Sequence, residues 1–145
     1  MTITRSLIVA QAREWIGTPY RHQASLKGVG CDCLGLVRGV WRAVIGEEPE
    51  RAPAYAPDWA EAGGVEALAD AAARHLTAIE RDAFKEGDVL LFRWRDNLAA
   101  KHAAIVTASD KIVHAHDGAA VAEVALAPWW RRRIAYVYRF PGVED

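Results

Sequence analysis

A cysteine in the first turn of a helix is the first candidate for chemistry in this sequence. Beginning at Cys33, apolar side chains recur at helical spacing, and they predict a helix that stops near Gly46. Unpaired backbone N–H groups and the positive end of the helix dipole stabilise a thiolate at such a position, and they also stabilise an oxyanion. This placement favours a nucleophilic Cys33, although a free cysteine on an apolar stripe is more often a small core residue.

A nucleophilic thiol needs a base, and histidine is the first candidate. His102 opens an apolar strand pattern, whereas His114 and His116 are two residues apart and share one face of the next strand. If these strands pair through the turn at Ser109-Asp110, His102 and His114 become close to cross-strand neighbours, so that one imidazole can orient the other. The alternative is a set of solvated histidines at strand ends.

The same side chains also admit a metal site. Cys31, Cys33, His102, His114 and His116 are enough ligands for tetrahedral zinc, but cysteines separated by one residue are closer than the usual zinc spacing. A ligated Cys33 could not act as a nucleophile, so we expect no metal and no other cofactor. The two cysteines are the only ones in the chain and are poorly placed for a relaxed disulfide. A disulfide scaffold is therefore excluded, and synthesis in a reducing compartment is expected.

The elements that must position these residues fall into two groups along the chain. Helical patterns come first and short β-branched strands follow, which indicates an α+β fold with an antiparallel sheet of about five to six strands. With 145 residues, no linker and no internal repeat, we expect a single domain over residues 1–145. The predicted helices cover residues 6–16, 33–44 and 58–75, and the predicted strands cover 89–92, 103–106, 111–114 and 120–124, before a last strand with Ile134, Tyr136, Tyr138 and Phe140 on one face.

Two tryptophan-containing segments accompany the histidines. Trp94 and the loop 96–100 directly precede His102, and we expect them to wall a substrate groove. Trp129-Trp130 is followed by the arginine run 131–133. We expect a short helix there that tucks one tryptophan under the sheet and leaves a solvated charged turn, in preference to a surface that docks a partner.

Charge and composition exclude several classes of protein. The formal net charge is −1, with 52% apolar and 26% charged residues, so the chain has no global field for gripping a polyanion and nucleic-acid binding is not expected. The apolar stretches are shorter than the roughly 20 residues that span a membrane. The N-terminal residues do not resemble a signal peptide, so we expect an unexported chain.

Several motifs, in order along the chain, together resemble the NlpC-type murein peptidases, which are papain-like cysteine enzymes that cut peptidoglycan stem peptides. Gly17-Thr18-Pro19-Tyr20 resembles the tyrosine-bearing loop of that family, and Cys31-Asp32-Cys33-Leu34-Gly35-Leu36-Val37 resembles its Asp-Cys-Ser-Gly-Leu-Val signature. Residues 87–92, 101–106 and 113–115 are similar to the strand before the catalytic histidine, the histidine strand and the segment of the third catalytic residue. The match spans about Leu7 to Phe140.

The resemblance implies a papain-like α+β fold and a catalytic set drawn from the residues above. Cys33 would be the nucleophile, His102 the general base and His114 the orienting third residue. His116 is a lesser candidate for the third position, because it shares the face of His114 but not its place in the motif.

Tyr20 and Leu34 are the remaining site residues that the resemblance implies. Tyr20 would bind substrate or the oxyanion together with the start of the helix at Cys33 and Leu34, or it is a loop aromatic packed on that helix. Leu34 stands where the family usually has serine. A hydroxyl near the scissile bond is therefore missing, which bears on specificity for the stem peptide and not on the chemistry.

The implied activity is that of a stem-peptide endopeptidase, with the bond between D-glutamate and diaminopimelate as the default substrate. The run Cys31–Arg42 is most similar to the branch encoded with phage tails and gene transfer particles. That branch implies a virion component made in the bacterial cytoplasm, attached to tail-tip or baseplate proteins and carried to the periplasmic cell wall. The alternatives are a structural tail or baseplate component with little or no activity, a zinc-binding module, or an acyltransferase that uses the same three residues.

Overall fold

The computed structural model describes residues 2–49 and 66–144. Four α-helices lie in this part of the chain, together with a 3-10 turn, η1, at Arg81–Ala83. The helices are α1 (Arg5–Arg13), α2 (Cys33–Val44), α4 (Ala67–His75) and α5 (Pro128–Arg131). None of the helices in the described residues has the length and hydropathy that crossing a membrane requires.

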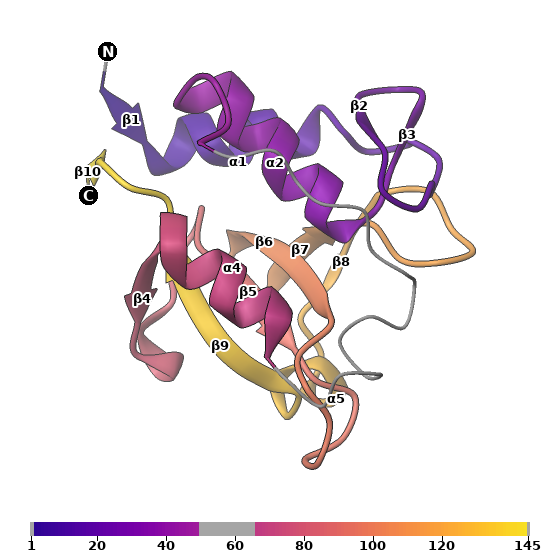
Figure 1. Ribbon diagram of the computed structural model, residues 1–145, viewed down its shortest axis with the longest axis vertical. Coiled ribbons are helices and arrows are strands. Elements are labelled where there is room, and N and C mark those ends of the chain that lie inside the picture. Colours follow the sequence, from indigo (N-terminus) through magenta and orange to yellow (C-terminus); the bar gives the residue numbers. More distant parts are fainter. Residues whose placement is uncertain (1, 50–65, 145) are drawn as a thin grey trace.

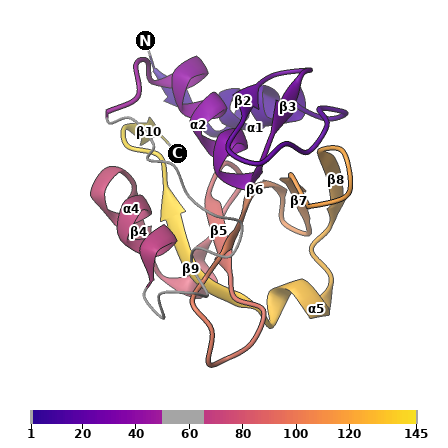
Figure 2. The same cartoon turned by 45° about the vertical axis from the view of Figure 1, so that its right-hand side comes forward.

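A six-stranded antiparallel sheet forms the other layer. Its strand order is β4-β9-β5-β6-β7-β8, and α1 and α2 pack on the side of β6 while α4 lies beside β4 and β9 (Figures 1 and 2). This arrangement confirms the predicted α+β fold, with helices from the first part of the chain on an antiparallel sheet. The strands are β4 (Thr77–Ile79), β5 (Val89–Phe92), β6 (His102–Ala108), β7 (Lys111–His114), β8 (Ala122–Ala125) and β9 (Ile134–Arg139).

Two small strand pairs lie outside this sheet. β2 (Ser25–Leu26) and β3 (Gly30–Cys31) form a hairpin that leads into α2. β1 (Ile3–Thr4) pairs in parallel with β10 (Val143–Glu144), so that both ends of the described chain lie together (Figure 1).

α1 and α2 begin and end close to their predicted bounds, whereas α4 ends at His75 as predicted but begins only at Ala67. α1 starts after Thr4, whose hydroxyl accepts a hydrogen bond from the N–H of Leu7 at 3.0 Å, and it ends at Arg13, three residues before the prediction. The next residues form a turn that reaches Gly17 at φ +91°, a conformation that glycine adopts without strain. The predicted start of the third helix, at Asp58, lies outside the described residues.

The strand predictions are confirmed for β5 and β7, and one prediction about β9 is wrong. Ile134 does not share a face with Tyr136 and Tyr138, because the pairing of β9 with β5 shifts register between Leu91 and Phe92. The extra residue of this bulge turns Ile134 to the other face of the sheet. The edge strand β4 was not predicted, since three residues carry too little alternation to reveal it.

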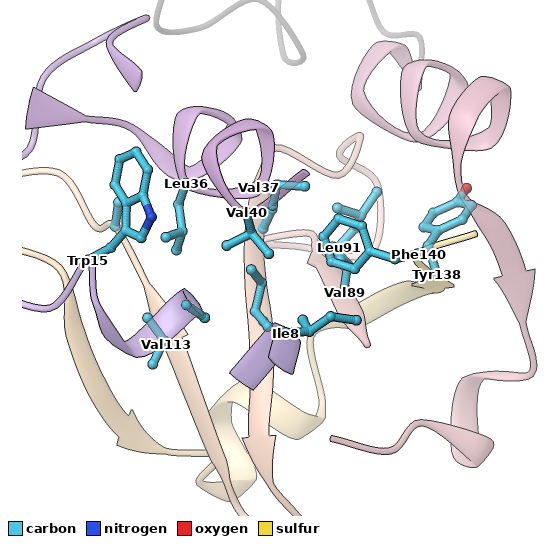
Figure 3. Close-up of a cluster of buried hydrophobic side chains, with 14 of the residues drawn as sticks. Ile8, Trp15, Leu36, Val37, Val40, Val89, Leu91, Val113, Tyr138 and Phe140 are labelled. Carbon is cyan, nitrogen blue, oxygen red and sulfur yellow. The ribbon is translucent and has the colours of Figure 1, made fainter. Parts of the chain in front are cut away.

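The two faces of the sheet bury separate apolar clusters. The larger cluster fills the space between the helices and the sheet, where Ile8, Leu36 and Val40 meet Val89 and Leu91 (Figure 3). The smaller cluster covers the opposite face and is built around Leu90, Phe92, Ala104, Val106 and Ile112. The sheet is therefore covered by apolar packing on both sides, which explains why β5 reads as an unbroken apolar run.

A buried carboxylate ties α1 to the sheet. Asp88 is fully buried just before β5, and it accepts hydrogen bonds from Arg5 at 3.1 Å and from Arg139 in a two-pronged contact at 2.9 Å and 2.9 Å. The N–H of Lys85 donates to the same carboxylate at 2.9 Å. A buried charge with this many donors is well compensated, but removing one partner leaves the others uncompensated.

We predict that Asp88→Asn lowers the free energy of unfolding by about 2 to 3 kcal/mol, because two guanidinium groups lose their common anion. Equilibrium unfolding in urea measures the change. Glu123→Gln is the matched control: it removes one carboxylate from a more exposed pair with Arg13, and it should shift stability by less than about 1 kcal/mol. Equal losses in the two variants would contradict the role assigned to Asp88.

Candidate active site

The first turn of α2 is built around the carboxylate of Asp32. This buried N-cap residue accepts a hydrogen bond from the N–H of Gly35 at 2.7 Å and another from the N–H of Gln23 at 2.7 Å. The first bond satisfies a helix N–H that has no partner inside the helix, and the second ties the preceding loop to the same point. Cys33 is therefore the first residue of α2, as the sequence predicted.

The loop before α2 packs directly on the helix at Gly35. A Cβ atom at this position would lie 1.9 Å from the carbonyl oxygen of Ala24. The hydroxyl of Ser25 donates to the carbonyl of Gly35 at 2.6 Å, which fixes the loop from its other side. Only glycine allows this approach, so the glycine of the sequence motif has a packing role next to the thiol.

The thiol of Cys33 lies against the backbone on either side of His102. Its Sγ is 4.0 Å from the carbonyl oxygen of Lys101, and the N–H of Ala103 points at the sulfur. Burial, followed by the charge of Asp32, raises the pKa of the Cys33 thiol to about 12, against the opposing effect of three backbone N–H groups. The prediction that the helix start stabilises a thiolate is therefore wrong for this conformation. Burial raises the pKa of the thiol by more than the N–H groups at the start of the helix lower it.

Two backbone N–H groups beside the sulfur are available to a ligand. Those of Cys33 and Leu34 begin α2, donate to no backbone carbonyl in the described residues and are directed at the sulfur, whose pKa they lower, so they face developing negative charge. Tyr20 is held alongside by its bridge to Cys31. Burial, then the charges of Cys33 and Asp32, raises the pKa of Tyr20 to about 12, so its neutral hydroxyl can donate.

His102 and His114 form a hydrogen-bonded pair between adjacent strands. His102 is the first residue of β6, His114 is the last of β7, and Nε2 of His102 lies 2.8 Å from Nδ1 of His114. The ladder pairs Ile105 with Val113, so its continuation places His114 opposite Ala104, with His102 as the diagonal neighbour on the same face. The predicted proximity of the two imidazoles is confirmed.

Both imidazoles are buried and neutral at pH 7. Only 5% of His102 and 6% of His114 is exposed. Burial, then the charges of His114 and His116, lowers the pKa of His102 well below its ordinary value, and burial, then the charge of His116, lowers the pKa of His114 to about 4. For Nδ1 of His102 to accept a proton, its Nε2–H must donate to His114, which fixes the tautomer of both rings.

His116 lies at the exposed edge of this pair. Its ring centroid is 5.5 Å from that of His102 and 5.7 Å from that of His114, and its Nδ1 is 3.2 Å from the carbonyl oxygen of Asp117. The ring of His116 makes no hydrogen bond to His102. His114 is therefore the histidine that orients the ring of His102.

Aromatic rings surround His102, and sequence reasoning identified only part of this shell. Trp94 stacks on the imidazole at 5.5 Å between centroids and an interplanar angle of 25°, and Trp130 stacks at 5.6 Å and 29°. Phe92, the cross-strand partner of His102, lies at 5.9 Å. The position of Trp94 just before His102 indicated its nearness, whereas Trp130 reaches the site only through the pairing of β9 with β5, for which the sequence offers no local signal.

The structure thus gathers Cys33, Tyr20 and Leu34 at the start of α2, beside the strand that carries His102 and its partner His114. No hydrogen bond joins the thiol to an imidazole in the described residues; the sulfur contacts the backbone that flanks His102 instead. No group of three or more His, Cys, Asp or Glu side chains in residues 2–49 and 66–144 is arranged to hold a metal ion.

Comparison with protein families gives one match over most of the chain. The family model described as the NlpC/P60 family matches residues 17–139, which include the start of α2 and both strands of the histidine pair. No curated protein matches the chain in sequence.

Solved structures share the fold at low sequence identity. The NlpC/p60 domain of the peptidoglycan hydrolase SagA is 23% identical with a TM-score of 0.66, over 94% of this chain and 98% of that one. An NlpC/P60 family protein from Bacillus cereus is 17% identical (TM-score 0.69), and the peptidoglycan hydrolase RipB from Mycobacterium tuberculosis is 16% identical (TM-score 0.62). This chain is covered to 97% and 93% in these two matches, but it spans only 41% and 63% of the two proteins.

We predict that acidification from pH 7 to pH 5 destabilises the fold. Unfolding restores an ordinary histidine pKa near 6.5, so below that pH the unfolded chain binds protons that the buried rings do not, and stability falls as pH falls. The depressed pKa of His114 alone corresponds to about 2 kcal/mol at pH 5. Urea unfolding at the two pH values measures the loss. His114→Gln should show a smaller pH-dependent loss than the parent, and an identical loss would contradict the neutral buried pair.

Proposed function

Because the chain belongs to the NlpC/P60 family of cysteine peptidoglycan hydrolases, we propose that it cleaves an amide bond of the murein stem peptide through Cys33, His102 and His114. The observation that carries this proposal is the 2.8 Å hydrogen bond between His102 and His114, on the strand whose backbone touches the sulfur of Cys33. It combines a nucleophile, a buried neutral base and a residue that orients the base.

The first step is attack by sulfur with loss of its proton. Nδ1 of His102 accepts the proton of the Cys33 thiol as Sγ bonds to the scissile carbonyl carbon, so the neutral resting thiol is converted as it reacts. The carbonyl oxygen becomes an oxyanion, which the N–H groups of Cys33 and Leu34 and the hydroxyl of Tyr20 stabilise. We infer that the sulfur leaves its contact with the backbone of Lys101 and Ala103 and meets the imidazole of His102 when the substrate binds.

Collapse of the oxyanion breaks the C–N bond and leaves a thioester on Cys33. The leaving amine takes the proton from His102, and the base is neutral again. Water then loses a proton to the same imidazole and attacks the thioester. The products are a free carboxylate and the restored thiol, so atoms and protons balance over the cycle.

The transient imidazolium on His102 is stabilised by aromatic faces and not by a carboxylate. His114 is neutral and offers only a lone pair. The indoles of Trp94 and Trp130 stack on the ring, and a cation near an indole face gains about 0.5 to 2 kcal/mol. The apolar setting that keeps the base neutral at rest therefore also supplies part of the stabilisation of its charged form.

The default scissile bond is the one between D-glutamate and diaminopimelate, as the family resemblance implies. Leu34 presents an apolar side chain where the family usually has a hydroxyl, and it is packed in part against the core. We infer that the substrate makes an apolar contact there in place of a hydrogen bond.

We further infer that the enzyme is carried on the tail of a phage-like particle and acts on the wall of the target cell. The support is the run Cys31–Arg42, which is most similar to the branch encoded with phage tails and gene transfer particles. Mass spectrometry of purified particles should detect the chain together with tail-tip or baseplate proteins. Particles without the chain, from cells that contain it, would overturn this placement.

We predict that Cys33→Ala abolishes murein hydrolysis, with a loss of at least about 10⁴-fold in rate, while the fold survives. Cys31→Ala is the matched control, because it removes the neighbouring thiol, whose side chain is buried in the core and faces no ligand. Mass spectrometry of the fragments released from purified sacculi measures activity and identifies the cut bond. Peptides released by folded Cys33→Ala would refute the catalytic assignment.

We predict that His114→Ala lowers kcat by about 10²-fold, since the tautomer of His102 is no longer fixed, whereas His116→Ala changes kcat by less than about threefold. Steady-state kinetics on a soluble muropeptide separates the two. The reverse order would assign the third catalytic position to His116.

A further inference from the structure

An arginine-lined pocket opens next to the histidine cluster. Its volume is about 550 Å³, and its walls come from the end of β5, the start of β9 and the turn η1. Pairing of the two strands brings the arginines together, because the N–H of Arg93 donates to the carbonyl of Arg133 at 3.0 Å. The lining side chains are Arg81, Arg93, Trp94, Arg95, Asp96, Arg132, Arg133 and Ile134.

Three of the five arginines that line the pocket, Arg95, Arg132 and Arg133, form no ion pair within the described residues. Asp96 is the one carboxylate among the described residues that line it. Arg93 is partly offset by Glu66 at 3.1 Å. In a chain with a formal net charge of −1, five guanidinium groups around one pocket are a local concentration and not a consequence of composition.

Backbone carbonyls hold several of these guanidinium groups in place without cancelling their charge. Arg81 donates to the carbonyls of Ile134 at 2.8 Å and Arg131 at 2.7 Å, and it also forms an exposed ion pair with Asp82 at 3.3 Å. Arg133 donates to the carbonyl of Trp129 at 2.9 Å, yet its buried Nε has no hydrogen-bond partner in the described residues. Carbonyl acceptors fix orientation but leave the cationic field intact, which is the condition for binding an anion.

Trp94 joins this pocket to the active site. Its indole lines the pocket and also stacks on His102 at 5.5 Å between centroids. A ligand in the pocket is therefore one side chain, that of Trp94, away from the imidazole of His102.

We propose that the arginine pocket binds a free carboxylate of the murein stem peptide; this rests on the proposed function and names the part of the substrate that is recognised. A stem peptide offers carboxylates on D-glutamate, diaminopimelate and its terminal residue. The planar guanidinium fork matches a carboxylate with two parallel hydrogen bonds. The pocket thus selects peptides with free carboxylates over amidated ones.

The test compares Arg95→Gln/Arg132→Gln with the parent enzyme on a soluble muropeptide with free carboxylates and on its fully amidated counterpart. Neither arginine has a partner to lose in the described residues, so the fold should be retained. We expect KM for the free-carboxylate peptide to rise about tenfold with kcat within about twofold. Amidation should weaken binding to the parent by a similar factor, and the double variant should not distinguish the two peptides.

The matched control is Arg13→Gln/Lys111→Gln, which removes two positive charges from the region of α1 and β7 and should leave KM unchanged. A similar rise in KM for this control would show that the effect comes from the net charge of the protein, and it would overturn the proposal that the pocket binds the carboxylate. An unchanged KM in Arg95→Gln/Arg132→Gln, or an equal loss on both peptides, would also overturn it.

Binding without turnover separates this proposal from the proposed function. In a Cys33→Ala background, calorimetry with the same two peptides should show the preference for free carboxylates, and the arginine double variant should abolish it. Preference with no hydrolysis by the parent would keep the pocket and reject the catalytic proposal. Hydrolysis by the parent without a preference for free carboxylates would keep the catalytic proposal and reject the carboxylate site. Inorganic phosphate or an oligonucleotide that binds more tightly than the free-carboxylate peptide would identify the pocket as a phosphate site. That result would overturn the proposal that it binds a carboxylate.

Discussion

The carboxylate of Asp32 is the point on which the geometry of this site depends. It caps α2 through the N–H of Gly35 and holds the preceding loop through the N–H of Gln23, so the helix can start at only one residue. A start one residue later would rotate Cys33 by about 100° and turn the sulfur away from β6. The close packing of Gly35 on Ala24 enforces the same register from the other side. The proposed nucleophile and the N–H donors beside it are thus placed by one buried anion.

A second constraint comes from the sheet, which places the base without using any charge. The side chains of His102 and His114 lie on the face of the sheet that Leu90, Phe92 and Val106 fill. The imidazoles are therefore desolvated as a consequence of the sheet packing. Desolvation keeps both rings neutral and leaves one lone pair on Nδ1 of His102 for the thiol proton. An orienting carboxylate would keep a charge permanently in this apolar face, at a desolvation cost that a second imidazole avoids.

Local patterns in the sequence predicted the elements that carry the proposed catalytic residues, and long-range pairing determined the rest. The two strands around Ser109-Asp110 were sufficient to predict that the two histidines lie near one another, whereas the thiol was expected beside them only from the family resemblance. The state of the thiol could not be predicted, because the burial that raises its pKa is produced by β6, far away in sequence. Trp130 was missed as part of the site for the same reason, and the bulge at Ile134 is invisible in an alternating pattern.

Trp94 separates two environments that differ in how they treat charge. On the side of His102 the two paired imidazoles are buried and neutral, and indole rings stack on His102 where an ionic partner could lie. In the arginine pocket the charged groups are guanidinium ions, and backbone carbonyls orient those of Arg81 and Arg133. A substrate anion can therefore be attracted to the pocket while the imidazole of His102 stays uncharged. If the same arginines faced His102 directly, their field would lower the affinity of Nδ1 for the thiol proton, so the indole between them keeps recognition and catalysis compatible.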